Sequence, residues 1–452
     1  MDKVQWFKIL TPEIKEMISN RDLRELRNFL VKPHPADIAS LLRELDPDER
    51  VLVFRLLGKD MAVDVFALLE PDEQEELLKY FTERRVKELL MEMDPDDRTQ
   101  LLDELPAEMV ERFLRLLPPE DREEANLLLN YPPNSAGRLM TTEYVGLRLD
   151  MSVSEALQRI RETGPDRETI YTCYVVNSTG HLHGVTTLKD IILAPAEKKI
   201  GEITNEMSFS LKTSDDQEVA AKIIQKYDLL AAPVVDSRGI LVGIITVDDV
   251  LDVVQEEATE DFHKMAAIQT PDENYFRGDF YTLLGKRVIW LVVLIFAATL
   301  SGKVLKSYSL LLSSVITLTY FIPMLTGTGG NIGSQSSTLV IRALATGEIS
   351  MKQWFAVLKR EVLMGATLGC ILGVVAFMVE MILLQDVLLG VTVGASLAVI
   401  AIVGNTVGTV TPMLFKLLKL DPAFVSSPLI ATIVDVTSLI IYFSIAGIIL
   451  SL

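Results

Sequence analysis

The chain has 452 residues, too many for one ordinary globular core, and its composition differs between two parts. Residues 1–287 carry a formal charge of −21, whereas the remainder carries +2 and is largely apolar. An acidic surface of this size disfavours nucleic acid and anionic lipid and favours cations, so no nucleic-acid partner is expected. A merely solvated surface is the alternative for most of these charges.

The cysteines and the N-terminus indicate an intracellular setting for the acidic part. Cys173 lies in that part and Cys370 in an apolar segment, so a disulfide between them is not expected. The first residues contain no apolar stretch ahead of a cleavage site. We therefore expect no signal peptide.

Residues 35–130 contain an internal repeat. The segments LDPDER, LEPDEQ, MDPDDR and LPPEDR place prolines 24 residues apart, at Pro47, Pro71, Pro95 and Pro119. Proline and carboxylates suit the first turn of a helix, and an amphipathic stretch follows each of them. One such unit cannot bury a core alone, so the units should stack. We predict an acidic, α-helical repeat domain over residues 1–133.

A doubled pattern of helix and strand occupies residues 134–254. The segments LHGVTTLKDII and LVGIITVDDVL resemble the second strands of tandem CBS domains, which end in glycine, two apolar residues, threonine and an aspartate three positions later. The matching residues are Gly184, Thr187 and Asp190 in the first copy and Gly243, Thr246 and Asp249 in the second. In nucleotide-binding CBS pairs the aspartate bonds a ribose, which makes Asp190 a candidate nucleotide ligand. Equally, each aspartate could cap the following helix.

The rest of the chain reads as a connector and a membrane domain. Residues 255–282 are predicted to form an acidic connecting helix, and residues 283–452 a transmembrane domain of five helices. The predicted spans are 288–308, 310–333, 362–384, 387–415 and 425–450. Basic residues cluster before the first, third and fifth spans. By the positive-inside rule we expect a multi-pass protein of the cell (inner) membrane, with cytoplasmic N-terminal domains and the C-terminus outside.

Polar residues interrupt the predicted spans. Asp435 lies within an otherwise apolar segment, where an aspartate costs about 2.5–3.5 kcal/mol to insert. A glycine cluster over Gly327–Gly333 and the stretch VGNTVGTVTP are also too polar for plain lipid-facing helix. Together these features indicate a polar pathway. Close helix packing through small residues is the alternative, and it is the favoured interpretation of Gly404 and Gly408.

The order of these parts, with the segments GTGGNIGSQSSTLVIRALATGEI and PLIATIVDVTSLIIYF, closely resembles the MgtE family of magnesium channels over nearly the whole chain. The resemblance implies a homodimer with its pore on the two-fold axis. Asp435 would be the ion-selecting residue, and the backbone of Ala431, Gly329 and Asn331 would complete the pore site. Magnesium suits this arrangement because it is usually held by one or two carboxylates and several waters. No Walker A sequence is present, so passive flux and no enzymatic activity are expected.

The resemblance also implies that cytoplasmic magnesium closes the pore by binding between the helical domain, the CBS pair and the connector. The carboxylates that it assigns to this sensing are Asp64, Asp96, Asp216, Glu218, Asp249, Asp252, Glu257, Glu260 and Asp261. Gln100 stands where a further acid would be expected near Asp96, and Gln255 where an acid would also have served. Without cations these acidic faces should repel one another.

Two other functions stay open on the sequence alone. The chain could be a membrane-anchored sensor whose CBS pair binds ATP or AMP, or the same pore could carry cobalt, manganese or calcium. A pure anchor has no need of Asp435 or of the glycine cluster, so we favour the channel. Magnesium ions, a second copy of the chain and membrane lipid are the expected partners, with ATP at the CBS pair as an optional cofactor.

Overall fold

The computed structural model describes residues 6–207, 209–266, 280–425 and 427–451. The chain divides into two compact units, Met1–Gln255 and Glu256–Leu452, and each is described by itself. The division falls within one helix, α15 (Val247–Met265), in which the second CBS copy continues directly into the predicted connector. The part of that connector over residues 267–279 lies outside the described residues.

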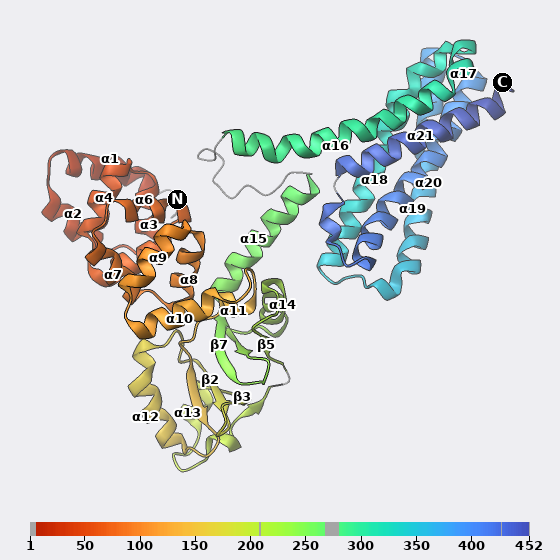
Figure 1. Cartoon of the computed structure of the whole chain (residues 1–452). Helices are drawn as coiled ribbons and strands as arrows, with labels where there is room; N and C mark the ends of the chain where they lie inside the picture. Colours follow the sequence, from red (N-terminus) through yellow and green to blue (C-terminus); the bar gives the residue numbers. More distant parts are fainter. Residues whose placement is uncertain (1–5, 208, 267–279, 426, 452) are drawn as a thin grey trace. The chain divides into compact units, whose positions relative to one another are not determined.

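Ten short helices build the beginning of the first unit (Figure 1). They are α1 (Trp6–Ser19), α2 (Leu23–Leu30), α3 (Pro35–Arg43), α4 (Pro47–Leu56), α5 (Lys59–Ala67), α6 (Pro71–Lys79), α7 (Glu83–Glu92), α8 (Pro95–Glu104), α9 (Ala107–Leu116) and α10 (Pro119–Leu129). The four repeat prolines each open a helix, as predicted. His34 caps α3 by accepting a hydrogen bond from the backbone of Ala36.

One side chain in each of the first three repeats satisfies a carbonyl of the preceding helix. Arg50 donates to the carbonyl of Leu42 (3.0 Å), and Gln74 donates to that of Phe66 (2.8 Å). Arg98 donates to the carbonyl of Leu90 at 3.3 Å. In each case the donor follows the acceptor by eight residues, so the same hydrogen bond recurs in each of these repeats. These bonds pair carbonyls at helix C-termini that have no partner within their own helix.

Both arginines also form an ion pair, each with the glutamate 26 residues later in the sequence. Arg50 contacts Glu76 at 2.8 Å, and Arg98 contacts Glu124 at 2.7 Å. The corresponding positions of the second repeat are Gln74 and Gln100. The glutamine at position 100 therefore stands where the other repeats carry the partner of an arginine.

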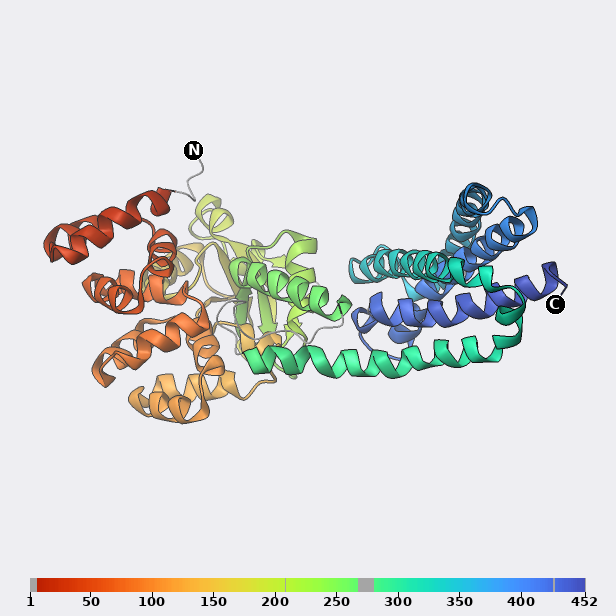
Figure 2. The same ribbon diagram turned by 90° about the horizontal axis from the view of Figure 1, so that it is seen from above.

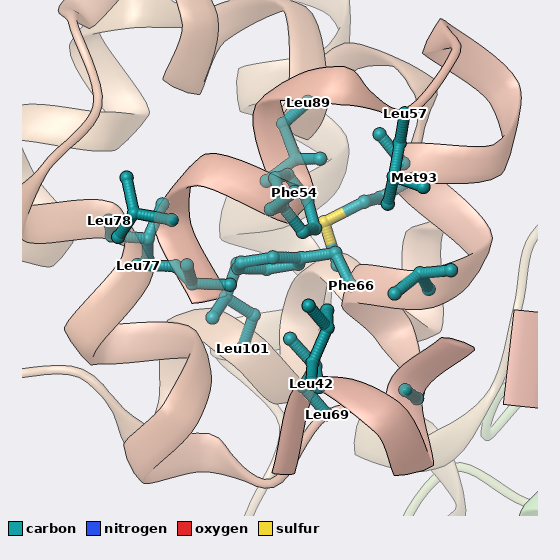
Figure 3. Packing of buried hydrophobic residues seen from close by; sticks show 14 of the residues in the cluster. Leu42, Phe54, Leu57, Phe66, Leu69, Leu77, Leu78, Leu89, Met93 and Leu101 are labelled. Atoms are coloured by element: carbon teal, nitrogen blue, oxygen red, sulfur yellow. The ribbon is translucent and has the colours of Figure 1, made fainter. Parts of the chain in front are cut away.

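The helical domain buries a continuous apolar core between its helix pairs. Phe54 and Phe66 meet edge to face, with ring centroids 6.1 Å apart, and Phe81 lies 5.3 Å from Phe54. Figure 3 shows Phe54 and Phe66 among leucines and Met93, which come from six different helices or their ends. This packing across repeats confirms that the units stack to bury a core.

Two small sheets form the CBS pair. The first has the order β1-β2-β3-β4 and the second the order β5-β6-β7. Their strands are β1 (Val145–Arg148), β2 (Thr172–Val176), β3 (Leu182–Thr187), β4 (Asn205–Glu206), β5 (Leu211–Lys212), β6 (Ala231–Val235) and β7 (Leu241–Thr246). The accompanying helices are α11 (Ala136–Leu139), α12 (Val153–Thr163), α13 (Leu188–Leu193), α14 (Gln217–Tyr227) and α15. In each sheet a parallel pair precedes an antiparallel hairpin.

The repeated CBS motif has a structural explanation in both copies. A Cβ on Gly184 would lie 2.4 Å from the carbonyl oxygen of Asn205, and one on Gly243 would lie 2.7 Å from that of Thr141. Asp190 accepts from the hydroxyl of Thr187 at 2.6 Å, and Thr187 in turn accepts from the backbone of Asp190. The capping alternative is therefore confirmed for the first copy. Thr246 and Asp249 share the same hydroxyl bond, at 2.5 Å.

Within residues 280–425 and 427–451, the second unit contains five long helices after α15. They are α16 (Phe280–Ser307), α18 (Ile322–Ala345), α19 (Trp354–Leu383), α20 (Val387–Leu417) and α21 (Ser427–Ile449), with the short α17 (Ser309–Ser314) before α18. All but α18 are long and apolar enough to cross a membrane. Helix α16 runs alongside α21 (Figure 2).

The second predicted span, 310–333, differs from the structure. Its residues divide between α17, a 3-10 turn over Ile316–Phe321 and the first half of α18. Pro323 lies in the first turn of α18, where proline favours a helix start. The helix then continues through the glycine cluster to Ala345. Helix α18 therefore lies almost entirely after the hydrophobic stretch on which the prediction of this span depended.

Glycines let α18 pack closely between α20 and α21. A Cβ on Gly329 would lie 2.7 Å from Ile400, and one on Gly333 would lie 2.9 Å from Ile430. From the other side, a Cβ on Gly404 would meet the carbonyl oxygen of Gly329 at 3.0 Å, and one on Gly408 that of Gly333 at 2.2 Å. The packing interpretation of Gly404 and Gly408 is therefore confirmed, and it extends to Gly329 and Gly333.

Candidate functional site

Carboxylates from three segments gather where the helical domain meets the CBS pair. They come from the start of α8, the loop before β2 and the start of α15. Their charges act on one another strongly enough to shift their pKa values. We call this group the α8–α15 acidic cluster; its members are Asp94, Asp96, Asp97, Glu168, Asp248, Asp249 and Asp252.

Burial and mutual repulsion make these groups unusually weak acids. Burial, with repulsion from Asp94 and Asp249, raises the pKa of Asp97 to about 7. The same two causes raise the pKa of Glu168 to about 7. Burial raises the pKa of Asp249 to about 6 although the hydrogen bond from Thr246 opposes the shift. At neutral pH the cluster thus holds charges that only a proton or another cation can compensate.

Asp96 is the most buried member of the cluster. Only 8% of it is exposed, and its Oδ1 has no hydrogen-bond partner among the described residues. Burial, followed by repulsion from Asp249, raises its pKa well above the usual range. The equivalent Asp48 of the first repeat is exposed on its helix start. The same repeat position therefore becomes a candidate cation ligand only where the CBS pair covers it.

The structure brings together only part of the predicted regulatory set. Asp96, Asp249 and Asp252 belong to the cluster, and the charge of Asp64 on α5 acts on Asp94. Asp216 instead caps α14 by accepting from the backbone of Glu218 at 2.9 Å. Glu218 itself pairs with Lys222 at 2.6 Å.

Across residues 6–207, 209–266, 280–425 and 427–451, no three histidine, cysteine, aspartate or glutamate side chains form a group that could hold a metal ion. A hydrated divalent cation needs fewer protein ligands than three, because one or two carboxylates and several waters suffice for magnesium. The unpartnered Oδ1 of Asp96 fits such a ligand. The acidic cluster is thus compatible with a water-rich cation site and not with a dehydrated cage.

The other predicted regulatory residues, Glu257, Glu260 and Asp261, lie in the second unit on the last turns of α15, and all three are half-buried. Glu260 accepts from Lys264 at 2.8 Å, and Lys264 also contacts Asp421 at 2.8 Å, in the connection between α20 and α21. Burial lowers the pKa of Lys264, but the bonds to Asp421 and Glu260 outweigh it and raise the pKa overall. The next residue, Met265, packs against an apolar cluster formed by Ile341, Val425, Ile430 and Val434.

Two of the predicted pore residues, Ala431 and Asp435, face α18 at Gly330, whereas the predicted Gly329 packs against Ile400 and Val434. A Cβ on Gly330 would lie 3.4 Å from the Cβ of Ala431 and 3.8 Å from Oδ1 of Asp435. Asp435 is half-buried, and Asn331 is exposed. Gly330, which lies between the predicted Gly329 and Asn331, is thus the glycine that faces the carboxylate. An isolated carboxylate on a membrane-length helix marks an ion pathway more often than a packing contact.

Comparison with known proteins identifies the family of the chain. Residues 322–445 match the family model MgtE, described as a divalent cation transporter. Residues 33–134 match the MgtE intracellular N domain, and residues 136–197 and 200–256 match the CBS domain. The magnesium transporter MgtE of Thermus thermophilus is 41% identical over 446 residues, which cover 98% of each chain. The chain belongs to the MgtE family of divalent cation transporters. It is therefore a multi-pass membrane transporter and not an enzyme.

Other MgtE proteins extend this comparison. The magnesium transporter MgtE of Bacillus subtilis is 34% identical over 430 residues, or 95% of each chain. A crystal structure of the cytosolic domain of the Mg2+ channel MgtE in complex with ATP matches with a TM-score of 0.52 and 41% identity, over 54% of this chain and all of that one. The soluble part of a magnesium transporter matches with the same TM-score and 32% identity, over 56% of this chain and 99% of that one. The MgtE fold of the cytosolic part is confirmed.

Sequence reasoning missed several site residues. Asp97 directly follows the predicted Asp96, and this adjacency is the sequence signal that could have identified it. Glu168 gave no signal, because it reaches the cluster from a loop position 64 residues after the end of α8. Lys264 and Asp421 are 157 positions apart and are joined only by the fold.

Proposed function

We propose that this MgtE protein is a magnesium-selective channel, gated by cytoplasmic magnesium, that passes ions down their electrochemical gradient through a homodimeric pore. The observation that carries the proposal is the approach of Gly330 to Ala431 and Asp435 in the membrane unit. Full-length relatives named as magnesium transporters support the choice of ion.

In this proposal the two copies of Asp435 face one another across a two-fold axis. The exposed Asn331 and the half-buried Asp435 leave a polar strip of the second unit for such a partner. Two carboxylates this close repel one another unless a divalent cation lies between them. Magnesium sheds water reluctantly, so two carboxylates and surrounding carbonyls, including those near Ala431, Gly329 and Asn331, suit a largely hydrated ion.

The acidic cluster would serve as the regulatory site on the cytoplasmic side. When magnesium binds, Asp96, Asp97 and Asp249 would supply carboxylate oxygens, and the ion would offset their repulsion. Docking of the helical domain then depends on magnesium concentration. Glu257, Glu260 and Asp261 would carry this signal along α15 to the pore, while Asp64, Asp252, Asp216 and Glu218 contribute further charge.

We also propose that the CBS pair binds ATP, since a matching MgtE cytosolic domain was crystallised with ATP. Oδ2 of Asp190 accepts the hydrogen bond from the Thr187 hydroxyl, so a ribose hydroxyl would bond to Oδ1 of Asp190. The proposed orientation places the N-terminal domains in the cytoplasm and the C-terminus outside the cell membrane.

The pore assignment is tested by magnesium flux into liposomes containing the purified full-length protein. Asp435→Ala and Asp435→Asn should both lower flux at least about tenfold, because each removes the paired negative charge. Asp386→Asn is the matched control, since Asp386 is an aspartate that caps α20. Undiminished flux in Asp435→Ala would exclude Asp435 from the pathway, and a protein that stays monomeric in detergent would contradict the two-fold pore.

A further inference from the structure

Glu361 is a second carboxylate inside the membrane unit, on α19. It lies seven residues after Trp354, about 10 Å along the helix from its first residue. Its Oε2 accepts from the hydroxyl of Ser336 on α18 at 3.1 Å and from the amide of Asn405 on α20 at 2.8 Å. One oxygen therefore connects three membrane helices.

The groups around Glu361 form a buried polar network. Ser336 Oγ also lies 2.9 Å from Thr409 Oγ1 and 3.1 Å from the carbonyl oxygen of Asn405. Thr409 donates to that same carbonyl at 2.8 Å. Ser336, Asn405 and Thr409 are at most 3% exposed. Such a network specifies one packing arrangement when its members are satisfied.

No lysine, arginine or histidine of the described segments lies within 4.0 Å of the Glu361 carboxylate as an ion-pair partner. Its charge is instead met by neutral donors, and hydrogen bonds to a charged acceptor are stronger than those between neutral groups. In a membrane helix a carboxylate without a counter-charge is expensive, so its bonds to α18 and α20 would be costly to break.

The position of Ser336 links this network to the pore. Ser336 follows Gly330 by six residues, about 9 Å along α18, and Gly333 between them packs against Ile430 and Val434 of α21. Because the Glu361 carboxylate fixes Ser336, it also fixes the position of Gly330 along the axis of α21. We propose that Glu361 is a positioning residue that keeps α18 in register, so that Gly330 faces Asp435.

This inference rests on the proposed function, in which Asp435 lines the ion pathway. It does not require any electrostatic attraction between Glu361 and the permeating ion. Glutamine keeps an acceptor oxygen at the same place, whereas alanine removes it. The pair Glu361→Gln and Glu361→Ala therefore separates positioning from ion attraction.

The test is magnesium and calcium flux in liposomes containing the full-length protein. Wild-type flux first establishes the proposed function independently. Glu361→Ala should lower magnesium flux about tenfold and reduce the ratio of magnesium to calcium flux, because a charge-assisted bond of this kind is worth about one decade. Glu361→Gln should stay within about threefold of wild type in both readouts, since only the charge assistance is lost. Glu348→Gln, at an exposed glutamate after α18, is the matched control.

Ser336→Ala provides an independent route if Glu361→Ala does not fold. It removes one hydroxyl and should lower flux in the same direction, and the double variant Ser336→Ala/Glu361→Ala should be no worse than Glu361→Ala alone. Equal loss in Glu361→Gln and Glu361→Ala would overturn positioning in favour of an ion-attracting charge. Wild-type flux and selectivity in Ser336→Ala would overturn the proposal as well.

Discussion

At the scale of single residues, environment decides which of many carboxylates can act. The repeat places an aspartate at the second position of the alternate helices α4, α6 and α8, as Asp48, Asp72 and Asp96. Only Asp96 is buried, because α15 and the loop carrying Glu168 lie against the start of α8. The sequence could nominate Asp435 through hydropathy and Asp249 through the CBS motif, and the resemblance to the MgtE family nominated Asp96. The sequence could not nominate Glu168 or Glu361, whose roles depend on contacts between distant segments.

The raised pKa values predict that docking of α8 depends on pH. Asp97 and Glu168 have pKa values of about 7 in the docked state, and Asp249 of about 6, against an ordinary value near 4 for a free carboxyl. A carboxyl whose pKa is raised binds its proton more tightly when docked. The docked state therefore has its full stability at low pH and loses it as the pH rises through about 6 to 7.

Hydrogen exchange of the full-length protein in detergent measures this effect. In EDTA, the amides of Pro95–Glu104 should be more protected at pH 5.5 than at pH 8, after correction for intrinsic exchange rates. Millimolar magnesium should restore protection at pH 8. Asp97→Asn should reduce the pH dependence and raise the pH 8 melting temperature in EDTA by about 2–4 °C. Equal protection at both pH values in EDTA would contradict the interpretation.

At the scale of helices, most of the fold was predictable from local chemistry. Repeat prolines open α4, α6, α8 and α10, and threonine–aspartate pairs cap the CBS helices. Helix α18 was misplaced, because hydropathy selects apolar residues whereas this helix is stabilised by close packing of glycines and serines. Packing of that kind depends on α20 and α21 and leaves no periodic signal in the sequence of α18 alone.

The second repeat predicts a compensating pair of substitutions. Gln74→Arg places a guanidinium at a site that is 7% exposed and lacks the glutamate found in the neighbouring repeats, so it should destabilise the helical domain by about 3 kcal/mol. Adding Gln100→Glu recreates the Arg50–Glu76 and Arg98–Glu124 arrangement. The double variant should recover most of the loss.

A double-mutant cycle of denaturant unfolding tests this compensation. The single Gln100→Glu variant supplies the fourth corner of the cycle, and Glu108→Gln, on the exposed side of α9, controls for a change of charge alone. If the double variant is no more stable than Gln74→Arg, the two positions do not form the pair that the repeat implies.

At the scale of the whole molecule, the end of α15 is the element that reaches the membrane helices. Lys264 joins Glu260 to Asp421 and lies 5.5 Å from the ring centre of Phe424, while Met265 packs against the apolar cluster that includes Ile430 and Val434. Asp421 lies six residues before α21 begins, so in the proposed gating a change in this contact would act on the helix that carries Asp435. Under the proposed function, this contact is the route from the connector to the pore.

Neutralising the connector should leave the channel open at high internal magnesium. The triple variant Glu257→Gln, Glu260→Gln and Asp261→Asn removes three negative charges, so magnesium should no longer hold α15 in place. Magnesium flux measured against internal magnesium concentration should lose its decline, with at least about tenfold higher flux at the inhibitory end.

Lys264→Met is the control for this experiment, because the triple variant also breaks the Lys264–Glu260 ion pair. If Lys264→Met alone abolished the decline of flux, the ion pair would account for the gating and the three carboxylates would not be sensors. Normal closure in the triple variant would remove the connector carboxylates from the mechanism.

The polar character of α18 has a consequence for how the protein is made. Four helices of the second unit are apolar enough to enter a bilayer by composition, and α18 is not one of them. Its buried Ser336 and its glycines find their partners on α19, α20 and α21, which leave the ribosome later. Biogenesis should therefore hold α18 at the insertion machinery until the following helices arrive, and chains truncated before α20 should fail to retain it in the membrane.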